Sequence, residues 1–246
     1  MNLTWQVSPE DAQKVKDFLA SQGGNRWYLD RIALVESGKP PKVTKDEIWK
    51  AMIYCLLTTQ QNSSKTSPIT RFHRQENFPL SYTVCLQEKN LAQKVTQTLT
   101  SFGGIRRTHR IAEELATNLC RLEDGAWDEQ LRGLNSLCCS DDPKLERHTA
   151  RQIAKDLKGF GPKQSRNLLV ELNLARNEIP IDSRIIKWLN TLPFPVHLNQ
   201  TALSDPDVYE LILDGFQALA KAAGVLPTVL DAAVFGSFDR SQGPTP

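Results

Sequence analysis

Apolar residues recur at helical spacing along most of the chain. The segment that begins at Ser8 has a serine cap, then proline and acidic residues, and its apolar stripe consists of Val15, Phe18 and Leu19. Residues 48–57 follow a capping box and are apolar nearly all round, which predicts a buried helix. No segment alternates apolar and polar residues with a period of two. The pattern therefore predicts a nearly all-helical fold.

The same spacing predicts helices in the rest of the chain, over residues 27–35, 90–102, 150–157, 163–174, 183–189, 205–219 and 227–235, with one more inside 125–148. Residues 65–90 are less regular, because Pro68 and Pro79 act as breakers. Aromatic and basic residues interleave between those prolines. They could line a DNA groove or form an ordinary amphipathic turn, and the sequence favours neither.

Two glycines one residue apart, Gly159 and Gly161, separate two helical segments and predict a tight hairpin between them. Glycine takes positive φ without penalty and lets another backbone approach closely. Pro162 suits the opening turn of the second helix, because that position has no helical partner for an N–H. The backbone from Gly161 to Lys163 opens this helix, where unpaired N–H groups and the positive dipole end favour a phosphate.

Composition alone does not identify a nucleic-acid-binding protein, because the 246 residues carry a net charge of only +2. Positive charge is nevertheless concentrated locally, at Arg106, Arg107, His109 and Arg110 and at Lys155, Lys158, Lys163 and Arg166. Each cluster fits either a set of phosphate contacts or a solvated helix face.

Cysteine spacing argues against a structural zinc site, because there is no C-x-x-C pair and no Cys/His ligand set. The five cysteines are Cys55, Cys85, Cys120, Cys138 and Cys139. Free thiols suit a reducing compartment. Without a signal-peptide pattern or a membrane-spanning apolar run, we expect a cytoplasmic, DNA-associated protein with no membrane partner.

The run L-K-G-F-G-P-K-Q-S-R-N at residues 157–167 resembles the helix-hairpin-helix of the DNA glycosylase superfamily that includes endonuclease III and the 8-oxoguanine DNA glycosylases. In that superfamily an apolar-Asp-x-x-apolar element follows the hairpin, and residues 181–185 supply I-D-S-R-I. Lys163 and Asp182 are 182 − 163 = 19 positions apart, which is similar to the family spacing. Residues 56–60 also resemble the family's L-x-[ST]-x-Q segment, although ordinary helix capping explains their polar side chains as well.

The resemblance implies an all-α fold with two helical domains flanking a DNA-binding cleft. One domain would span residues 46–175 and end in the helix-hairpin-helix motif at 150–174; the other would combine residues 1–45 and 176–246. The resemblance also implies two catalytic and seven DNA-binding residues. These are Lys163 and Asp182 for catalysis, and Gly159, Phe160, Gly161, Pro162, Gln60, Gln61 and Arg184 for DNA.

By this resemblance the chain is a bifunctional DNA glycosylase/AP lyase acting on 8-oxoguanine or another oxidised base. Asp182 would stabilise the oxocarbenium-like transition state, and Lys163 would form a Schiff base before β-elimination. The expected partner is double-stranded DNA with a damaged, modified or abasic nucleotide, bound by a monomer. No cysteine follows Cys139, so we expect no iron–sulfur cluster and no metal, although the hairpin could hold a monovalent or divalent cation.

The sequence leaves two other hypotheses for the function open. In a monofunctional glycosylase, Lys163 would bind phosphate without forming a covalent bond. In a non-catalytic DNA-binding protein, the hairpin would only bind the DNA backbone. Asp182 also fits the N-cap of helix 183–189, either as its sole role or together with a catalytic one.

Overall fold

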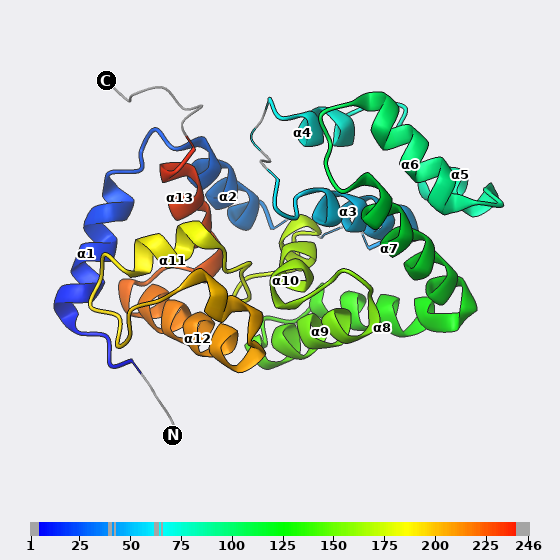
Figure 1. The fold of residues 1–246 in the computed structure, drawn as a ribbon. Coiled ribbons are helices and arrows are strands. Elements are labelled where there is room, and N and C mark those ends of the chain that lie inside the picture. Colours follow the sequence, from blue (N-terminus) through cyan, green and yellow to red (C-terminus); the bar gives the residue numbers. More distant parts are fainter. Residues whose placement is uncertain (1–4, 39–40, 42, 62–63, 65, 240–246) are drawn as a thin grey trace. The chain divides into compact units, whose positions relative to one another are not determined.

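The computed structural model describes residues 5–38, 41, 43–61, 64 and 66–239, and its regular elements in these ranges are helices (Figure 1). The all-helical fold predicted from the sequence is therefore confirmed for the described residues. Contacts within the chain group it into two compact units. Unit 1 combines residues 1–40 and 175–246, and unit 2 consists of residues 41–174.

Unit 2 runs from α3 to α10, in light blue through green to yellow-green in Figure 1. Its helices are α3 (Lys45–Leu57), α4 (Pro68–His73), α5 (Tyr82–Gln87), α6 (Leu91–Phe102), α7 (Thr108–Arg121), α8 (Trp127–Leu137), α9 (Pro143–Asp156) and α10 (Pro162–Glu171), with a π-helical turn, η1 (Leu122–Ala126), between α7 and α8. As predicted, α3 is buried nearly all round, and Trp49, Met52 and Leu57 have no exposed surface. The indole N–H of Trp49 donates to the carbonyl of Leu80 at 3.1 Å and fixes the chain that enters α5.

The prolines expected to break residues 65–90 do not prevent helix formation there. Pro68 occupies the first turn of α4, where the hydroxyl of Ser67 accepts from the Thr70 N–H. Ser81 caps α5 in the same way. Proline at the start of a helix removes an N–H that has no helical partner, so it begins this helix.

The first helix of the hairpin is longer than its periodicity predicted. It was expected over residues 150–157, but α9 begins at Pro143 with the side chain of Asp142 as its N-cap. An Asp-Pro pair is a helix start signal of the same kind as Ser8-Pro9. The second hairpin helix is shorter than predicted, because Asn173 adopts positive φ (57°) and ends it.

Unit 1 contains helices from both ends of the chain, shown in blue and in yellow to red in Figure 1. These are α1 (Pro9–Ala20), α2 (Arg26–Glu36), α11 (Ser183–Leu189), α12 (Pro206–Ala223) and α13 (Pro227–Ser237), with a short 3-10 turn, η2 (Gln200–Ser204). Val15 of α1, Ile185 of α11 and Phe216 of α12 lie in one apolar core. Within the described residues no single helix is long and apolar enough to cross a membrane, although the bent pair α12 and α13 has the length and composition together.

Candidate active site

The hairpin between α9 and α10 depends on two glycines in different conformations. Gly159 has φ +86°, a region that favours glycine, whereas Gly161 is extended at φ −90°, ψ −170°. Between them Phe160 is only 3% exposed, and its N–H donates to the Leu157 carbonyl at 3.2 Å. The side chain of Phe160 therefore anchors the turn in the core, so the predicted DNA contact of its side chain is not available in this structure.

Helix α7 holds the hairpin through a fully buried asparagine, Asn118. Its side chain donates to the Lys158 carbonyl at 2.9 Å and accepts from the Lys158 N–H at 2.7 Å. One turn later, Arg121 donates to the Asp156 carbonyl at 2.9 Å. The backbone entering the turn is therefore fixed by side chains about forty positions earlier in the chain.

Gly159 also lies too close to its neighbours to carry a side chain. An added Cβ would come within 2.7 Å of the Glu114 carboxyl carbon and 2.8 Å of a Leu56 methyl group. Both neighbours are buried, and Glu114 is further held by Arg110 at 2.9 Å. Glycine at this position is thus required by conformation and by space.

The start of α10 has no side-chain cap. Its N-cap residue is Gly161, which is exposed, and an added Cβ there would meet nothing within 4 Å. The carbonyl of Pro162 accepts from the Ser165 hydroxyl at 3.1 Å and from the buried guanidinium of Arg166 at 3.0 Å. The first turn is therefore stabilised by side chains of α10 itself. The positive end of the helix dipole faces an open position that suits an anion.

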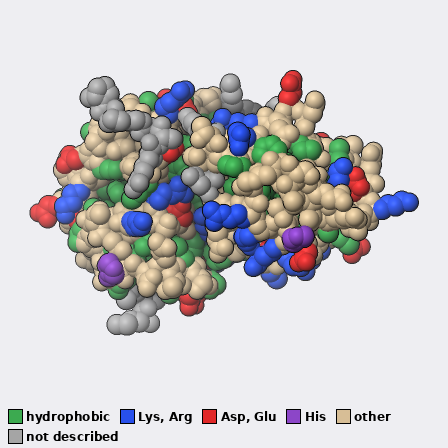
Figure 2. All heavy atoms as spheres, turned by 45° about the horizontal axis from the view of Figure 1, so that its top comes forward, with side chains coloured by type: hydrophobic (Ala, Val, Ile, Leu, Met, Phe, Trp, Pro, Cys, Tyr) green, Lys and Arg blue, Asp and Glu red, His purple; other side chains and the backbone are tan. Residues whose placement is uncertain are grey.

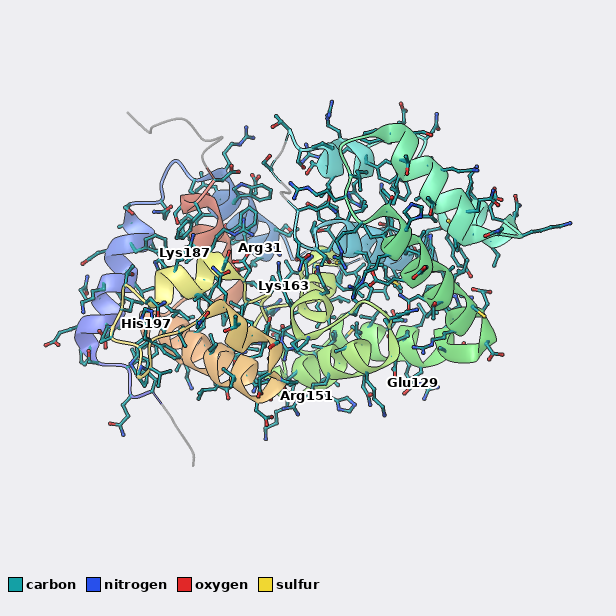
Figure 3. The ribbon with its side chains drawn as sticks, in the orientation of Figure 1. Arg31, Glu129, Arg151, Lys163, Lys187 and His197 are labelled. Carbon is teal, nitrogen blue, oxygen red and sulfur yellow. The ribbon has the colours of Figure 1, made fainter. Side chains whose placement is uncertain are left out.

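Lys163 extends from this first turn and is half-buried (Figure 3). Its charge acts on the thiol of Cys55, which is completely buried in α3. Burial raises the pKa of Cys55 well above its usual value, and Glu171 raises it further, while Asn167 and Lys163 act in the opposite direction. Cys55 therefore stays a neutral thiol and supplies no negative charge to balance Lys163.

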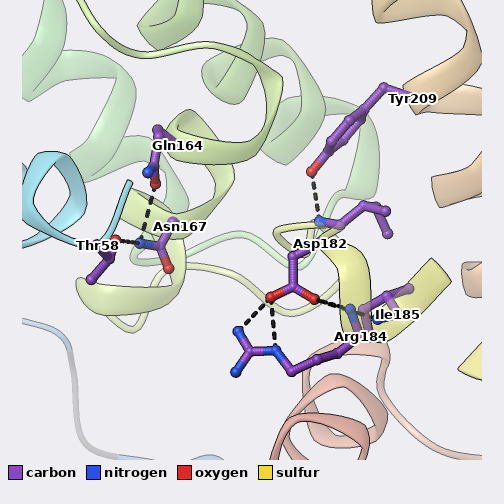
Figure 4. A network of polar contacts seen from close by, with 8 residues as sticks. Thr58, Gln164, Asn167, Asp182, Arg184, Ile185 and Tyr209 are labelled. Carbon is purple, nitrogen blue, oxygen red and sulfur yellow. Dashed lines mark hydrogen bonds and ion pairs between the residues drawn. The ribbon is translucent and has the colours of Figure 1, made fainter. Parts of the chain in front are cut away.

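Polar side chains join α10 to the end of α3, and Figure 4 shows Thr58, Gln164 and Asn167 among them. Gln164 donates to the Thr59 hydroxyl at 2.6 Å, and Asn167 donates to the Thr58 hydroxyl at 3.5 Å and to Gln164 at 3.4 Å. Sequence reasoning missed Gln164 and Asn167 as site residues. The available signal was that the two amides are three positions apart and therefore lie on the same face of the helix.

The two glutamines after α3 behave differently. Gln60 is exposed and has φ +57°, which is uncommon for a residue with a side chain and costs conformational energy. Gln61 accepts from the Arg106 N–H at 2.7 Å and donates to its carbonyl at 3.2 Å. The amide of Gln61 thus ties two loops of unit 2 together, whereas Gln60 is displayed to solvent.

In unit 1, Asp182 is the N-cap of α11. Its Oδ1 accepts from the backbone N–H of Arg184 at 2.8 Å and of Ile185 at 3.4 Å (Figure 4). The structural role considered from the sequence is confirmed, and it fixes the orientation of the carboxylate. One oxygen serves the cap, while the other lies outside it.

A buried tyrosine shapes the backbone that leads to Asp182. The hydroxyl of Tyr209, in α12, donates to the Ile179 carbonyl at 3.1 Å and accepts from the Ile181 N–H at 2.7 Å. Tyr209 has no exposed surface. Sequence reasoning missed it, because a tyrosine on an amphipathic helix gives no sign of which distant backbone its hydroxyl meets.

Arg184 was predicted to contact DNA, and in the structure its guanidinium lies against Asp182. Its Nε donates to Asp182 Oδ2 at 2.9 Å, and Nη2 contacts the same oxygen. The guanidinium also stacks on Phe235 of α13, 3.8 Å from the ring centroid. Phe235 packs edge-on against Trp27 with 5.0 Å between their centroids, so the stacking platform is itself fixed.

Lys163 belongs to unit 2 and Asp182 to unit 1, and their approach to a shared nucleotide stays a prediction. Within the described part of the chain, no group of three or more His, Cys, Asp or Glu side chains could hold a metal ion. Lys, Arg, Asp and Glu side chains are mixed over the surface visible in Figure 2, in keeping with the small net charge.

No protein-family model and no curated protein sequence matches the chain. Two solved structures match its fold, both of an 8-oxoguanine DNA glycosylase from Methanocaldococcus jannaschii. The structure of the glycosylase/lyase with a 15mer DNA containing 8-oxoguanine has a TM-score of 0.65 at 14% identity, covering 97% of this chain and 99% of the other. The second structure has a TM-score of 0.63 at 15% identity and covers 91% of each chain. The all-α fold expected from the motif resemblance is thereby confirmed. The arrangement of two domains around a DNA-binding cleft stays a prediction.

Proposed function

We propose that this protein is a DNA glycosylase with AP lyase activity, which flips a damaged nucleotide out of double-stranded DNA and removes its base. The observation that carries the proposal is the hairpin itself. Its turn is held by Asn118, its second helix starts without a side-chain cap, and Lys163 stands on the first turn of that helix. A chain with the fold of an 8-oxoguanine glycosylase/lyase thus carries a lysine at an open helix start.

The hairpin would bind the DNA backbone and supply no sequence specificity. The N–H groups of the first turn of α10 and the positive dipole end favour a phosphate, and Gly161 leaves room for it to approach. Gln60, displayed with positive φ beyond the end of α3, would occupy the gap that the flipped nucleotide leaves.

Asp182 would stabilise the charge that develops when the N-glycosidic bond breaks. The transition state has oxocarbenium character at C1′, and a carboxylate of fixed orientation lowers its energy electrostatically. The cap contacts with Arg184 and Ile185 provide that orientation. Asp182→Asn preserves a good N-cap but removes the charge, so base excision should fall by orders of magnitude while DNA binding survives.

Lys163 would act as the nucleophile of the lyase step. Its neutral amine attacks C1′ as the base leaves with the bonding electrons, and opening of the sugar ring gives a protonated Schiff base. Loss of a C2′ proton then expels the 3′ phosphate strand, and water releases the lysine. These steps use Lys163, Asp182 and water, and they proceed on one copy of the chain.

For the substrate we propose 8-oxoguanine, because a matching structure holds DNA containing this base. An oxidised pyrimidine would use the same groups and is the alternative within the class. A panel of duplexes, each with one lesion, identifies the base by its release.

Borohydride trapping tests the proposal on duplex DNA that contains 8-oxoguanine or an abasic site. Reduction of the Schiff base should give a covalent protein–DNA adduct in the natural protein and none in Lys163→Gln. Lys158→Gln is the matched control, since it removes a nearby exposed lysine and should leave the adduct intact. Base release without an adduct would instead indicate a monofunctional glycosylase, and DNA binding without base release would leave a binding protein.

A further inference from the structure

The carboxylate assigned to the transition state is already neutralised by Arg184. Asp182 Oδ1 is used by the helix cap, and Oδ2, the oxygen left to face a sugar cation, accepts from the guanidinium of Arg184. An ion pair of this kind behaves as a dipole at distance, so it stabilises a developing positive charge less than a free carboxylate does.

The guanidinium is placed so that an anion can compete for it. The side chain of Arg184 is 32% exposed, whereas that of Asp182 is 14% exposed. One face of the guanidinium lies on Phe235, which holds its plane at 3.8 Å from the ring centroid. Planar guanidinium groups bind phosphate through paired N–H bonds, and only side-chain rotation is needed to leave Asp182.

We propose that Arg184 is a counterion latch: it pairs with Asp182 in the free protein and transfers to a phosphate when DNA binds, which removes the positive charge of the guanidinium from the carboxylate. This inference rests on the proposed function for its DNA ligand. It assigns Arg184 a second partner besides the phosphate predicted from the sequence, and it couples DNA binding to the charge at Asp182.

The latch predicts an energetic link between Asp182 and Arg184 in DNA binding. Asp182→Asn releases Arg184 before DNA arrives, so affinity should rise by about three- to tenfold, because the partly exposed ion pair with its two contacts to Oδ2 no longer has to be exchanged. In an Arg184→Gln background the same substitution should change affinity less than about twofold, because no guanidinium remains to be released.

The test is a double-mutant cycle on a duplex with a tetrahydrofuran abasic analogue, which is not cleaved. Dissociation constants are measured by fluorescence anisotropy for the natural protein, Asp182→Asn, Arg184→Gln and the double variant, across a series of salt concentrations. Arg184→Gln should also reduce the slope of log affinity against log salt by about one, the signature of one lost phosphate contact.

A control separates the latch from a general loss of positive charge. Lys187→Gln removes an exposed cation from the same helix, and the gain from Asp182→Asn should persist in that background. The latch is refuted by an equal gain from Asp182→Asn in the natural and Arg184→Gln backgrounds, or by an unchanged salt slope in Arg184→Gln. If the glycosylase proposal is wrong, the protein will bind DNA without releasing a base, and this outcome is distinct from a failure of the latch. If the natural protein does not bind DNA, both the latch and the glycosylase proposal are refuted.

Discussion

Replacing Gly159 by alanine should destabilise unit 2 without touching any group assigned to catalysis. The new Cβ forces an alanine to φ +86°, which costs about 1 kcal/mol relative to glycine. It also overlaps the Glu114 carboxyl carbon at 2.7 Å and a Leu56 methyl at 2.8 Å, and overpacking of this kind costs about 1–3 kcal/mol. Neither neighbour can move freely, because Leu56 lies in the core and Glu114 is held by Arg110.

The free energy of unfolding should therefore fall by about 2–4 kcal/mol in Gly159→Ala, measured by urea unfolding with far-ultraviolet circular dichroism. Gly161→Ala is the matched control, since its Cβ meets no atom within 4 Å and its φ of −90° suits any residue. That variant should stay within about 1 kcal/mol of the natural protein, yet bind duplex DNA more weakly, because the added methyl group occupies the phosphate approach. A Gly159→Ala variant as stable as the natural chain would show that the turn does not have this geometry.

Three further outcomes follow from contacts outside the hairpin. Tyr209→Phe leaves two buried backbone groups without their shared hydroxyl, so stability to urea should fall by about 1–3 kcal/mol, and single-turnover base excision should slow while DNA affinity is retained. Burial lowers the pKa of His73 to about 4, so the unfolded chain takes up a proton first and stability should decrease as pH falls from about 6.5 to 4; His73→Phe should flatten this pH dependence. A thiol reagent at pH 8 should modify the exposed Cys120 and Cys139 and spare Cys55, whose pKa is raised by burial, and labelling of Cys55 in the native protein would contradict its placement.

The hairpin could be predicted from the sequence because its determinants are adjacent in the chain. Gly159, Gly161 and Pro162 each restrict local conformation, and Asp182 stands directly before an apolar helix that needs a cap. Short-range steric rules are sufficient for such features. Asp142-Pro143 is a local signal of the same kind, and it places the start of α9 earlier than the apolar periodicity of residues 150–157 does.

The supporting contacts could not be predicted, because they join positions that are distant in the chain. Asn118 meets Lys158 forty positions later, and Tyr209 meets Ile181 twenty-eight positions earlier. Arg184 is a different case: the motif pointed to DNA, whereas the structure shows the nearest carboxylate as its partner. A pattern identifies the residue type that a site needs, but competition between partners is decided only in three dimensions.

The two hydrogen bonds between Asn118 and Lys158 involve only the main chain of Lys158, and its side chain takes no part in them. Residue 158 is exposed, so a substitution there can change the charge of the hairpin while the backbone keeps its conformation. The change in charge would alter the attraction for a polyanion. Any replacement that retains an amide hydrogen is compatible with this arrangement, and proline is the foreseeable exception. Under the proposed function, DNA affinity can thus be changed at residue 158 independently of the backbone that presents it.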